Sequence, residues 1–126
     1  MHIYPDGNCE LLKEGIATAK GVLPEQIIVG NGSDEIIKLI GESFLTDGSS
    51  LIIGYPSFSE YAFAGHLMGA NVVNVPLVDY TYDLKGILAA IDETTKMVVI
   101  CNPNNPTGTA VGKEALIQFV KLVAFL

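Results

Sequence analysis

Arginine is absent from this 126-residue sequence: all seven basic residues are lysines, against fourteen acidic side chains. Proteins that bind carboxylate or phosphate groups commonly use the bidentate guanidinium of arginine. Either the chain binds no such group, or part of its binding site lies outside these residues. The net charge of −7 argues against nucleic acid or an anionic membrane as a partner.

Cysteine and long apolar runs are also scarce. Cys9 and Cys101 are the only cysteines, and no Cys/His group has metal-ligand spacing. This pattern predicts reduced thiols in a cytoplasmic protein without a metal site. No run approaches the ~18 apolar residues of a membrane span, and no basic-then-apolar N-terminal pattern indicates a signal peptide. The 49% hydrophobic content excludes intrinsic disorder.

Short apolar runs alternate with helical patterns along the chain. The runs predict strands over 26–29, 51–53, 72–77 and 97–101, with Pro76 indicating an edge strand or a strand end. Helices are predicted between them and from residue 113 onward. This order is typical of an α/β domain with a mostly parallel sheet.

Polar residues and glycines mark where the predicted helices begin and end. Asn8 is a predicted cap for the first helix, with Gly21 as its stop. Ser33 or Asp34 is the expected cap of the second helix, and Ser57 with a glutamate three residues later forms a capping-box pattern for the third.

Three segments beyond predicted strand ends are candidates for chemistry, because ligands of parallel α/β sheets bind there. The segment 30–35, Gly-Asn-Gly-Ser-Asp-Glu, offers backbone N–H groups for a phosphate, and a plain helix cap explains it equally well. The segment 55–61 holds three aromatic residues that suit either packing or ligand stacking. The segment 102–108, Asn-Pro-Asn-Asn-Pro-Thr-Gly, has more amides and prolines than a bare turn needs and favours a functional loop.

The order of these motifs, with Tyr-Pro-Asp-Gly at residues 4–7, resembles the pyridoxal-phosphate-dependent aminotransferases of fold type I, and within them the histidinol-phosphate aminotransferase branch. The resemblance covers essentially the whole chain. It implies a three-layer α/β fold with helices on both faces of the sheet, pyridoxal 5′-phosphate as cofactor, and a homodimer. It also implies amino-group exchange between histidinol phosphate and 2-oxoglutarate in histidine biosynthesis.

The same resemblance assigns cofactor contacts residue by residue. Asn105 corresponds to the asparagine that hydrogen-bonds the O3′ atom of the cofactor ring. Phe58 corresponds to the aromatic that stacks on that ring, where relatives often have tyrosine. Gly32, Ser33 and Asp34 correspond to the phosphate-binding helix start, and Tyr4 to a tyrosine that reaches the cofactor phosphate of the neighbouring subunit.

The resemblance further implies that residues 1–126 are the first part of the large, cofactor-binding domain. The Schiff-base lysine, the aspartate at the pyridine nitrogen and the substrate-binding arginine are then expected beyond residue 126, with the small C-terminal domain. The mostly apolar run 115–126 agrees with a chain that continues or with an interface. No catalytic residue is expected within the chain, which alone should be inactive. The alternatives are an aromatic-amino-acid aminotransferase, a threonine-phosphate decarboxylase or a non-catalytic remnant.

Overall fold

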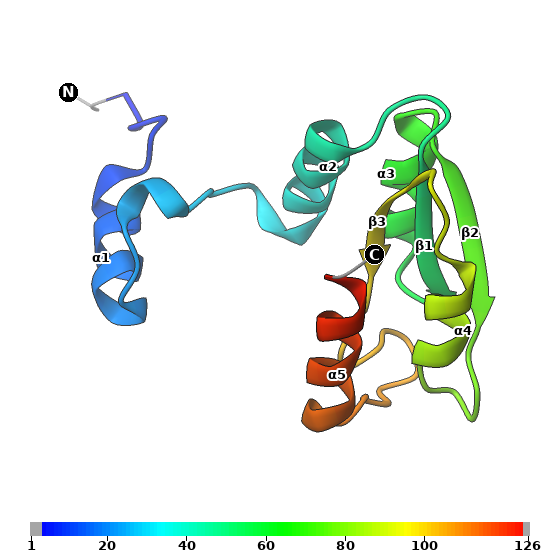
Figure 1. Ribbon diagram of the computed structural model, residues 1–126. Helices are drawn as coiled ribbons and strands as arrows, with labels where there is room; N and C mark the ends of the chain where they lie inside the picture. The colour runs from blue at the N-terminus through cyan, green and yellow to red at the C-terminus, as the bar shows by residue number, and fades with distance from the viewer. Residues whose placement is uncertain (1–3, 125–126) are drawn as a thin grey trace. The chain divides into compact units, whose positions relative to one another are not determined.

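The computed structural model describes residues 4–124, which form two compact units, one ending at Ile36 and one beginning at Ile37 (Figure 1). The elements of the first unit are α1 (Glu10–Lys20), a 3₁₀ turn η1 (Pro24–Gln26) and the start of α2 (Gly32–Phe44). The second unit holds the rest of α2, β1 (Ser50–Tyr55), α3 (Ser59–Leu67), β2 (Asn71–Pro76), α4 (Leu84–Ala90), β3 (Thr95–Val99) and α5 (Lys113–Val123).

Helix α1 of the first unit is fixed at both ends by short-range contacts. The Asp6 carboxylate accepts hydrogen bonds from the backbone N–H groups of Asn8 (2.9 Å) and Glu10 (2.7 Å). These bonds lower the pKa of Asp6, the bond from Glu10 contributing most. Gly21 ends the helix in the left-handed conformation at φ 68°, as predicted. The predicted cap at Asn8 is wrong, because Asp6 accepts the helix-start bonds and Cys9 occupies the N-cap position.

The predicted strand at 26–29 is also wrong. Gln26 ends the 3₁₀ turn, and its side chain accepts a hydrogen bond from the backbone N–H of Leu23 at 2.9 Å. Residues 27–30 pair with no strand among the described residues, and Ile28 is 64% exposed. Extended apolar residues form a stable strand only where a neighbouring strand takes up their backbone groups.

The second unit is built on a three-stranded sheet in the order β2-β1-β3, with both pairs parallel. Central β1 is buried from Ser50 to Gly54, and its side chains alternate between the two faces. Ile52 belongs to a core cluster with Ile87 of α4 and Phe119 of α5. Leu51 and Ile53 belong to another cluster, against which α3 packs.

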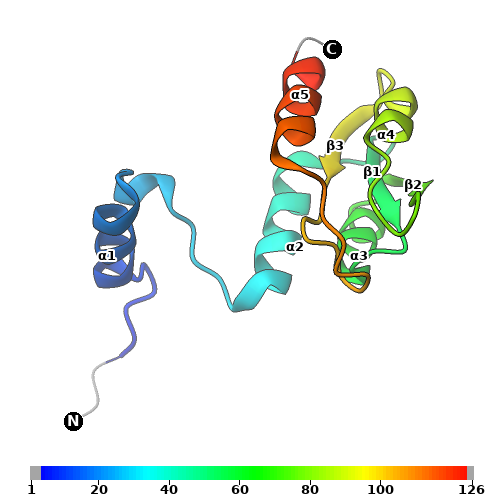
Figure 2. The same ribbon diagram turned by 90° about the horizontal axis from the view of Figure 1, so that it is seen from below.

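Helices therefore cover both faces of the sheet: α4 and α5 lie on one face and α3 on the other (Figures 1 and 2). This confirms the predicted α/β class with a parallel sheet. Strand β2 is an edge strand that ends at Pro76, as its proline predicted.

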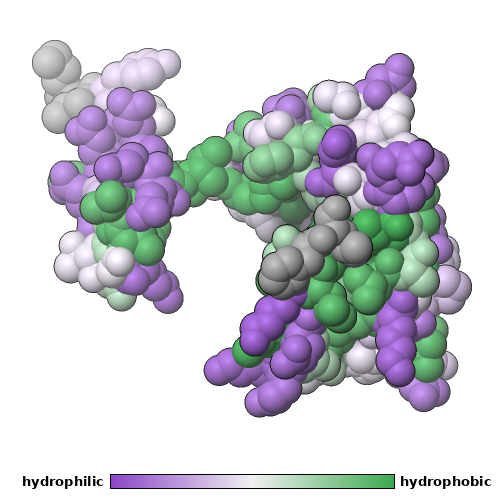
Figure 3. Space-filling model, viewed as in Figure 1, coloured by the Kyte–Doolittle hydropathy of each residue, from purple (hydrophilic) through white to green (hydrophobic). Residues whose placement is uncertain are grey.

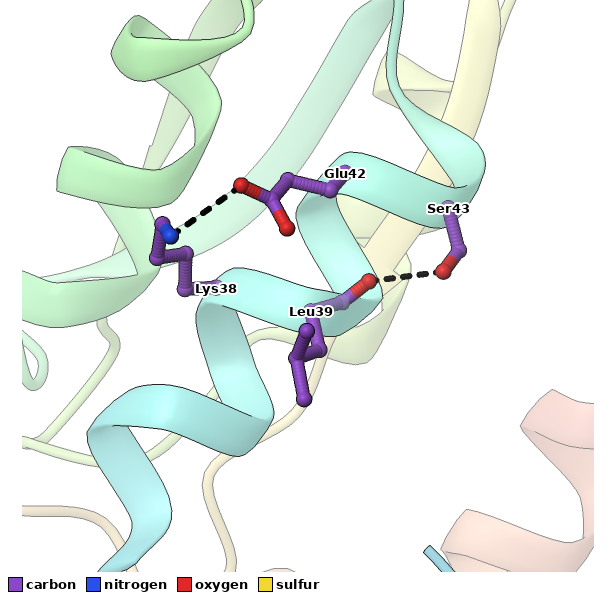
Figure 4. Close-up of polar contacts among 4 residues, drawn as sticks. All are labelled: Lys38, Leu39, Glu42 and Ser43. Carbon is purple, nitrogen blue, oxygen red and sulfur yellow. Dashed lines mark hydrogen bonds and ion pairs between the residues drawn. The ribbon is translucent and has the colours of Figure 1, made fainter. Parts of the chain in front are cut away.

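The exposed side of α2 is held by contacts within the helix (Figure 4). Lys38 and Glu42 form an ion pair of 3.2 Å one turn apart, with the two side chains 51% and 41% exposed. The Ser43 hydroxyl donates to the Leu39 carbonyl at 2.7 Å. An exposed pair of this kind is worth roughly 0.3–0.5 kcal/mol, so the helix depends mainly on its apolar side.

Candidate functional site

Two loops of the second unit follow the carboxyl ends of the parallel strands β1 and β3. The first loop comprises residues 56–58 and leads into α3, and the second comprises residues 102–111 and leads toward α5. In parallel α/β sheets, ligands bind beyond the carboxyl ends of the strands. Phe58 lies on the first loop and Asn105 on the second, so the structure places both predicted ring contacts at strand ends of the same sheet.

The second loop is closed by its own polar groups. The Asn102 amide nitrogen donates to the carbonyl of Val111 at 3.1 Å, and the Val111 N–H donates to the Asn102 amide oxygen at 2.8 Å. The backbone of Asn104 accepts from Gly108 N–H at 2.7 Å and donates to the carbonyl of Thr109 at 2.8 Å. Gly108 has φ 72°, which glycine adopts without the strain of a side chain. The loop therefore has a defined conformation.

Asn104 links this loop to the first one. Only 3% of the residue is exposed. Its amide nitrogen donates to the carbonyl of Pro56 at 3.1 Å and to the hydroxyl of Thr107 at 2.9 Å. Its amide oxygen accepts a hydrogen bond of 2.8 Å from the hydroxyl of Ser57. All the hydrogen-bonding groups of the Asn104 side chain are used within the protein.

Ser57 in turn is bonded to Tyr82, whose hydroxyl donates to the Ser57 oxygen at 2.8 Å. The predicted capping box at Ser57 is therefore wrong: Phe58 occupies the N-cap position of α3 without a side-chain cap, and the serine hydroxyl points to Asn104 instead. Sequence reasoning missed Asn104, Ser57 and Tyr82 as parts of this site. The only available signal was the unusual density of polar residues beside the prolines.

Asn105 differs from its neighbour Asn104. It is exposed, and its side-chain amide forms no hydrogen bond with the residues that the structure describes. A free amide on a rigid loop at a strand end is available to a ligand.

Phe58 presents a fixed aromatic ring. The side chain is half-buried, and its ring packs edge-to-face on Tyr61 of α3, with centroids 5.8 Å apart and planes at 83°. Burial of Tyr61, followed by the neighbouring Cys101 thiol, raises the pKa of the tyrosine to about 12. Tyr61 is thus a partly buried, uncharged aromatic partner that holds the Phe58 ring by its edge-to-face contact.

The other predicted contacts, Tyr4, Gly32, Ser33 and Asp34, belong to the first unit. Helix α2 begins at Gly32, before the predicted caps Ser33 and Asp34, so those cap assignments are wrong. The side chain of Glu35 accepts a hydrogen bond from the backbone N–H of Asn31, the residue before the helix.

At the start of α2, the Ser33 hydroxyl contacts the Asp34 carboxylate at 3.3 Å. Gly32 has φ 79°. The N–H groups of Ser33 and Asp34 have no acceptor among the described residues, as is usual in a first helical turn. The N–H groups of Ser33 and Asp34 are therefore free to bind a ligand anion. Tyr4, the remaining predicted contact, is 92% exposed.

Within residues 4–124, no three His, Cys, Asp or Glu side chains lie close enough together to bind a metal ion. Cys9 and Cys101 are free thiols. None of the described helices is both long and apolar enough to span a membrane.

The chain belongs to the aminotransferase class I and II family, whose profile matches residues 1–125. Its relatives include the histidinol-phosphate aminotransferase of Moorella thermoacetica, 47% identical over 123 residues that cover 98% of this chain and 32% of the relative. The enzyme of the same name from Caldicellulosiruptor saccharolyticus is 46% identical over 98% of this chain and 34% of the relative. The chain thus spans about a third of the length of the curated relatives it matches.

Solved structures agree with this assignment. Histidinol-phosphate aminotransferase from Sinorhizobium meliloti, in complex with pyridoxal-5′-phosphate, superposes with a TM-score of 0.86 at 27% identity, over 94% of this chain and 33% of that structure. The Clostridium acetobutylicum enzyme gives a TM-score of 0.78 at 33% identity, over 96% and 35%.

Proposed function

We propose that this chain is the first part of the cofactor-binding domain of a pyridoxal-phosphate-dependent aminotransferase. The amino group would be exchanged between L-histidinol phosphate and 2-oxoglutarate, in histidine biosynthesis. The observation that carries the proposal is that a free amide, Asn105, and a half-buried aromatic ring, Phe58, follow the carboxyl ends of two adjacent parallel strands, β3 and β1. The 47% identity to a relative named histidinol-phosphate aminotransferase supports histidinol phosphate as the amino donor.

The residues of each unit, taken separately, suit one part of pyridoxal phosphate, a planar aromatic ring that carries a hydroxyl and a phosphate. The Phe58 ring supplies a face for stacking, and the Asn105 amide nitrogen supplies a hydrogen bond to the ring oxygen O3′. The N–H groups of Ser33 and Asp34, with the Ser33 hydroxyl, suit a phosphate at the positive end of the 13-residue helix α2. Gly32 has a left-handed backbone and no side chain, and the space around its Cα is open, so a ligand can approach the backbone of this turn.

Asp34 takes part through its backbone alone. A carboxylate beside a phosphate is repulsive, so the side chain of Asp34 has to turn away when its N–H binds the anion. The Ser33 hydroxyl, which lies 3.3 Å from that carboxylate, is then free to donate to the phosphate instead. The chain contains no arginine that could pair with the phosphate, and the proposal adds Tyr4 of the neighbouring subunit as a further, uncharged contact of the phosphate.

Pyridoxal phosphate, when bound, supplies the electron sink on which amino-group transfer depends. Phe58 and Asn105 hold the ring in place, and the amide of Asn105 stabilises negative charge on O3′. The proposal includes a cytoplasmic homodimer. It places the covalent lysine, the pyridine-binding aspartate and the substrate-binding arginine outside this chain, which alone should not turn over substrate.

Substitution of Asn105 in the full-length protein tests the proposal. Asn105→Ala should lower kcat on the order of 10²-fold, because the lost hydrogen bond acts on charge that develops during the reaction. Cofactor dissociation should change much less, since charge-assisted bonds to the phosphate dominate affinity. Ser33→Pro, which removes a phosphate-binding N–H, should release the cofactor. Asn74→Ala, an exposed asparagine of β2, is the matched control and should change neither quantity.

The assay should compare histidinol phosphate with tyrosine as amino donors to 2-oxoglutarate, and should monitor carbon dioxide release from threonine phosphate. A larger kcat/KM for histidinol phosphate is expected. If tyrosine is preferred, or if carbon dioxide is released, the substrate assignment is wrong. If Asn105→Ala releases cofactor as readily as Ser33→Pro while the bound enzyme turns over normally, the role of Asn105 is wrong.

A further inference from the structure

The residues immediately before Phe58 and Asn105 are bonded to each other. The Ser57 hydroxyl donates to the Asn104 amide oxygen at 2.8 Å, although the two residues are 47 positions apart in the sequence. A second bond runs between the same loops, from the Asn104 amide nitrogen to the Pro56 carbonyl at 3.1 Å. The loop that carries the stacking ring and the loop that carries the free amide are therefore connected directly.

Tyr82 extends this connection into the core. Only 5% of the residue is exposed, and its hydroxyl donates to the Ser57 oxygen at 2.8 Å. A Cβ atom at Gly54 would lie 2.7–2.9 Å from three atoms of the Tyr82 ring, so the ring lies against the bare backbone of β1. Gly54 thus lets the tyrosine hydroxyl reach the end of the central strand.

The network has one arrangement in which every member is satisfied. Tyr82 donates to Ser57, Ser57 donates to Asn104, and both hydrogens of the Asn104 amide are donated onward to Pro56 and Thr107. No buried side-chain polar atom within residues 4–124 lacks a partner. Because an unpaired buried polar group is costly, a satisfied chain of bonds specifies a single geometry.

We propose that Ser57, Asn104 and Tyr82 are positioning residues of the cofactor site, which fix the free amide of Asn105 relative to the ring of Phe58. This inference rests on the proposed function. The two adjacent asparagines then have separate roles: Asn104 is committed to the protein and Asn105 to the ligand. Small errors in the position of a reacting group are costly in catalysis, so the network affects turnover without touching the substrate.

The test uses the full-length protein loaded with pyridoxal phosphate. Ser57→Ala should lower kcat on the order of tenfold, the effect of losing one hydrogen bond of ordinary strength. The KM for the amino donor should change little, and the absorption maximum of the bound cofactor should shift. Ser57→Thr keeps the hydroxyl and should restore both. Ser59→Ala, the same change two residues later at an exposed site, is the matched control and should leave both unchanged.

A double-mutant cycle separates positioning from a general structural role. If Ser57 acts through Asn105, then Ser57→Ala should have little further effect on kcat in an Asn105→Ala background. If Ser57→Ala leaves kcat and the spectrum unchanged, or lowers kcat by the same factor in both backgrounds, the positioning role is overturned. Should Ser57→Ala fail to unfold cooperatively, Tyr82→Phe removes only the outer hydroxyl and is put through the same cycle.

Failure of the inference and failure of the proposed function are distinguishable. An unsubstituted protein that binds no pyridoxal phosphate overturns both. An unsubstituted protein that binds the cofactor and transfers amino groups, while the substitutions at Ser57 and Asn105 have additive effects, overturns the positioning role alone.

Discussion

At the scale of single residues, side chains of the same type that lie close together in the sequence differ in their burial and in their contacts. Tyr61 and Tyr55 illustrate this within the second unit. Tyr55 ends β1 and is 63% exposed, whereas Tyr61 packs on Phe58 and beside Cys101. Burial disfavours the phenolate, so the pKa of Tyr61 rises from the usual 10.0 to about 12.

This shift makes stability depend on pH in the alkaline range. Between pH 10 and about 12, the unfolded chain releases the Tyr61 proton while the folded protein keeps it. The free energy of unfolding should therefore fall as pH rises through this window. In Tyr61→Phe the fall should be less steep, and in the control Tyr55→Phe it should match that of the unsubstituted protein. Urea unfolding at several pH values measures the slopes, and equal slopes in all three proteins would contradict the shift.

Sequence reasoning at this scale identified candidates for ligand contact and missed the residues that support them. Asn105 and Phe58 were predicted from motifs that mark a family, and the structure places both at strand ends of one sheet. Asn104 could not be distinguished from Asn105, because the difference arises from partners far away in the sequence. The bond between Ser57 and Asn104 spans 47 positions, so no local pattern indicates it.

At the scale of elements, contacts between helices and strands depend on glycine where the backbones approach. Gly65 of α3 faces the sheet, and a Cβ atom there would lie 2.8 Å from Leu51 of β1 and 2.8 Å from Val72 of β2. Gly15 of α1 has open space instead, since a Cβ atom there would meet no atom within 4 Å apart from its chain neighbours and the backbone of its own helix. One substitution type should therefore have opposite effects at the two sites.

Gly65→Ala should destabilise the protein by about 1–3 kcal/mol, because the added methyl group overpacks the layer between α3 and the sheet. Gly15→Ala should stabilise it by about 0.5–1 kcal/mol, because alanine loses less backbone entropy in a helix interior. Thermal unfolding of both variants in the full-length protein checks the prediction. A melting temperature for Gly65→Ala at or above that of the unsubstituted protein would show that α3 can move away from the sheet.

The elements themselves were predicted well where the signal was local. Short apolar runs between helical patterns predicted the buried strand β1, the less buried strands β2 and β3 and the helices between them within a few residues. The strand expected at 26–29 failed because no neighbouring strand among the described residues takes up its backbone groups. The predicted caps of α1 and α2 were wrong because other side chains, one turn or less away, accept hydrogen bonds from the backbone at the helix starts. Asp6 accepts from the N–H of Glu10, and Glu35 accepts from the N–H of Asn31.

At the scale of the whole chain, an exposed apolar surface and a net negative charge have opposite effects on self-association. Strand β3 is an edge of the described sheet, and beside it a groove of about 740 Å³ is lined by apolar side chains of β3 and α5, including Met97, Leu116, Phe119 and Val120. Hydrophobic residues gather on the face that carries α5 (Figure 3). Exposed apolar grooves and unpaired edges favour association, whereas a net charge of −7 favours separation.

The 126-residue chain expressed alone should therefore self-associate, and more strongly as salt screens the repulsion between copies. Val120→Lys places a charge in the groove and should shift the chain toward the monomer. Val78→Lys is the matched control: Val78 and Val120 are each 57% exposed, and Val78 lies outside the groove. Size-exclusion chromatography at low and high salt measures both variants. If the unsubstituted chain elutes as a monomer at both salt concentrations, or if the two variants dissociate it equally, the groove beside β3 is not the associating surface.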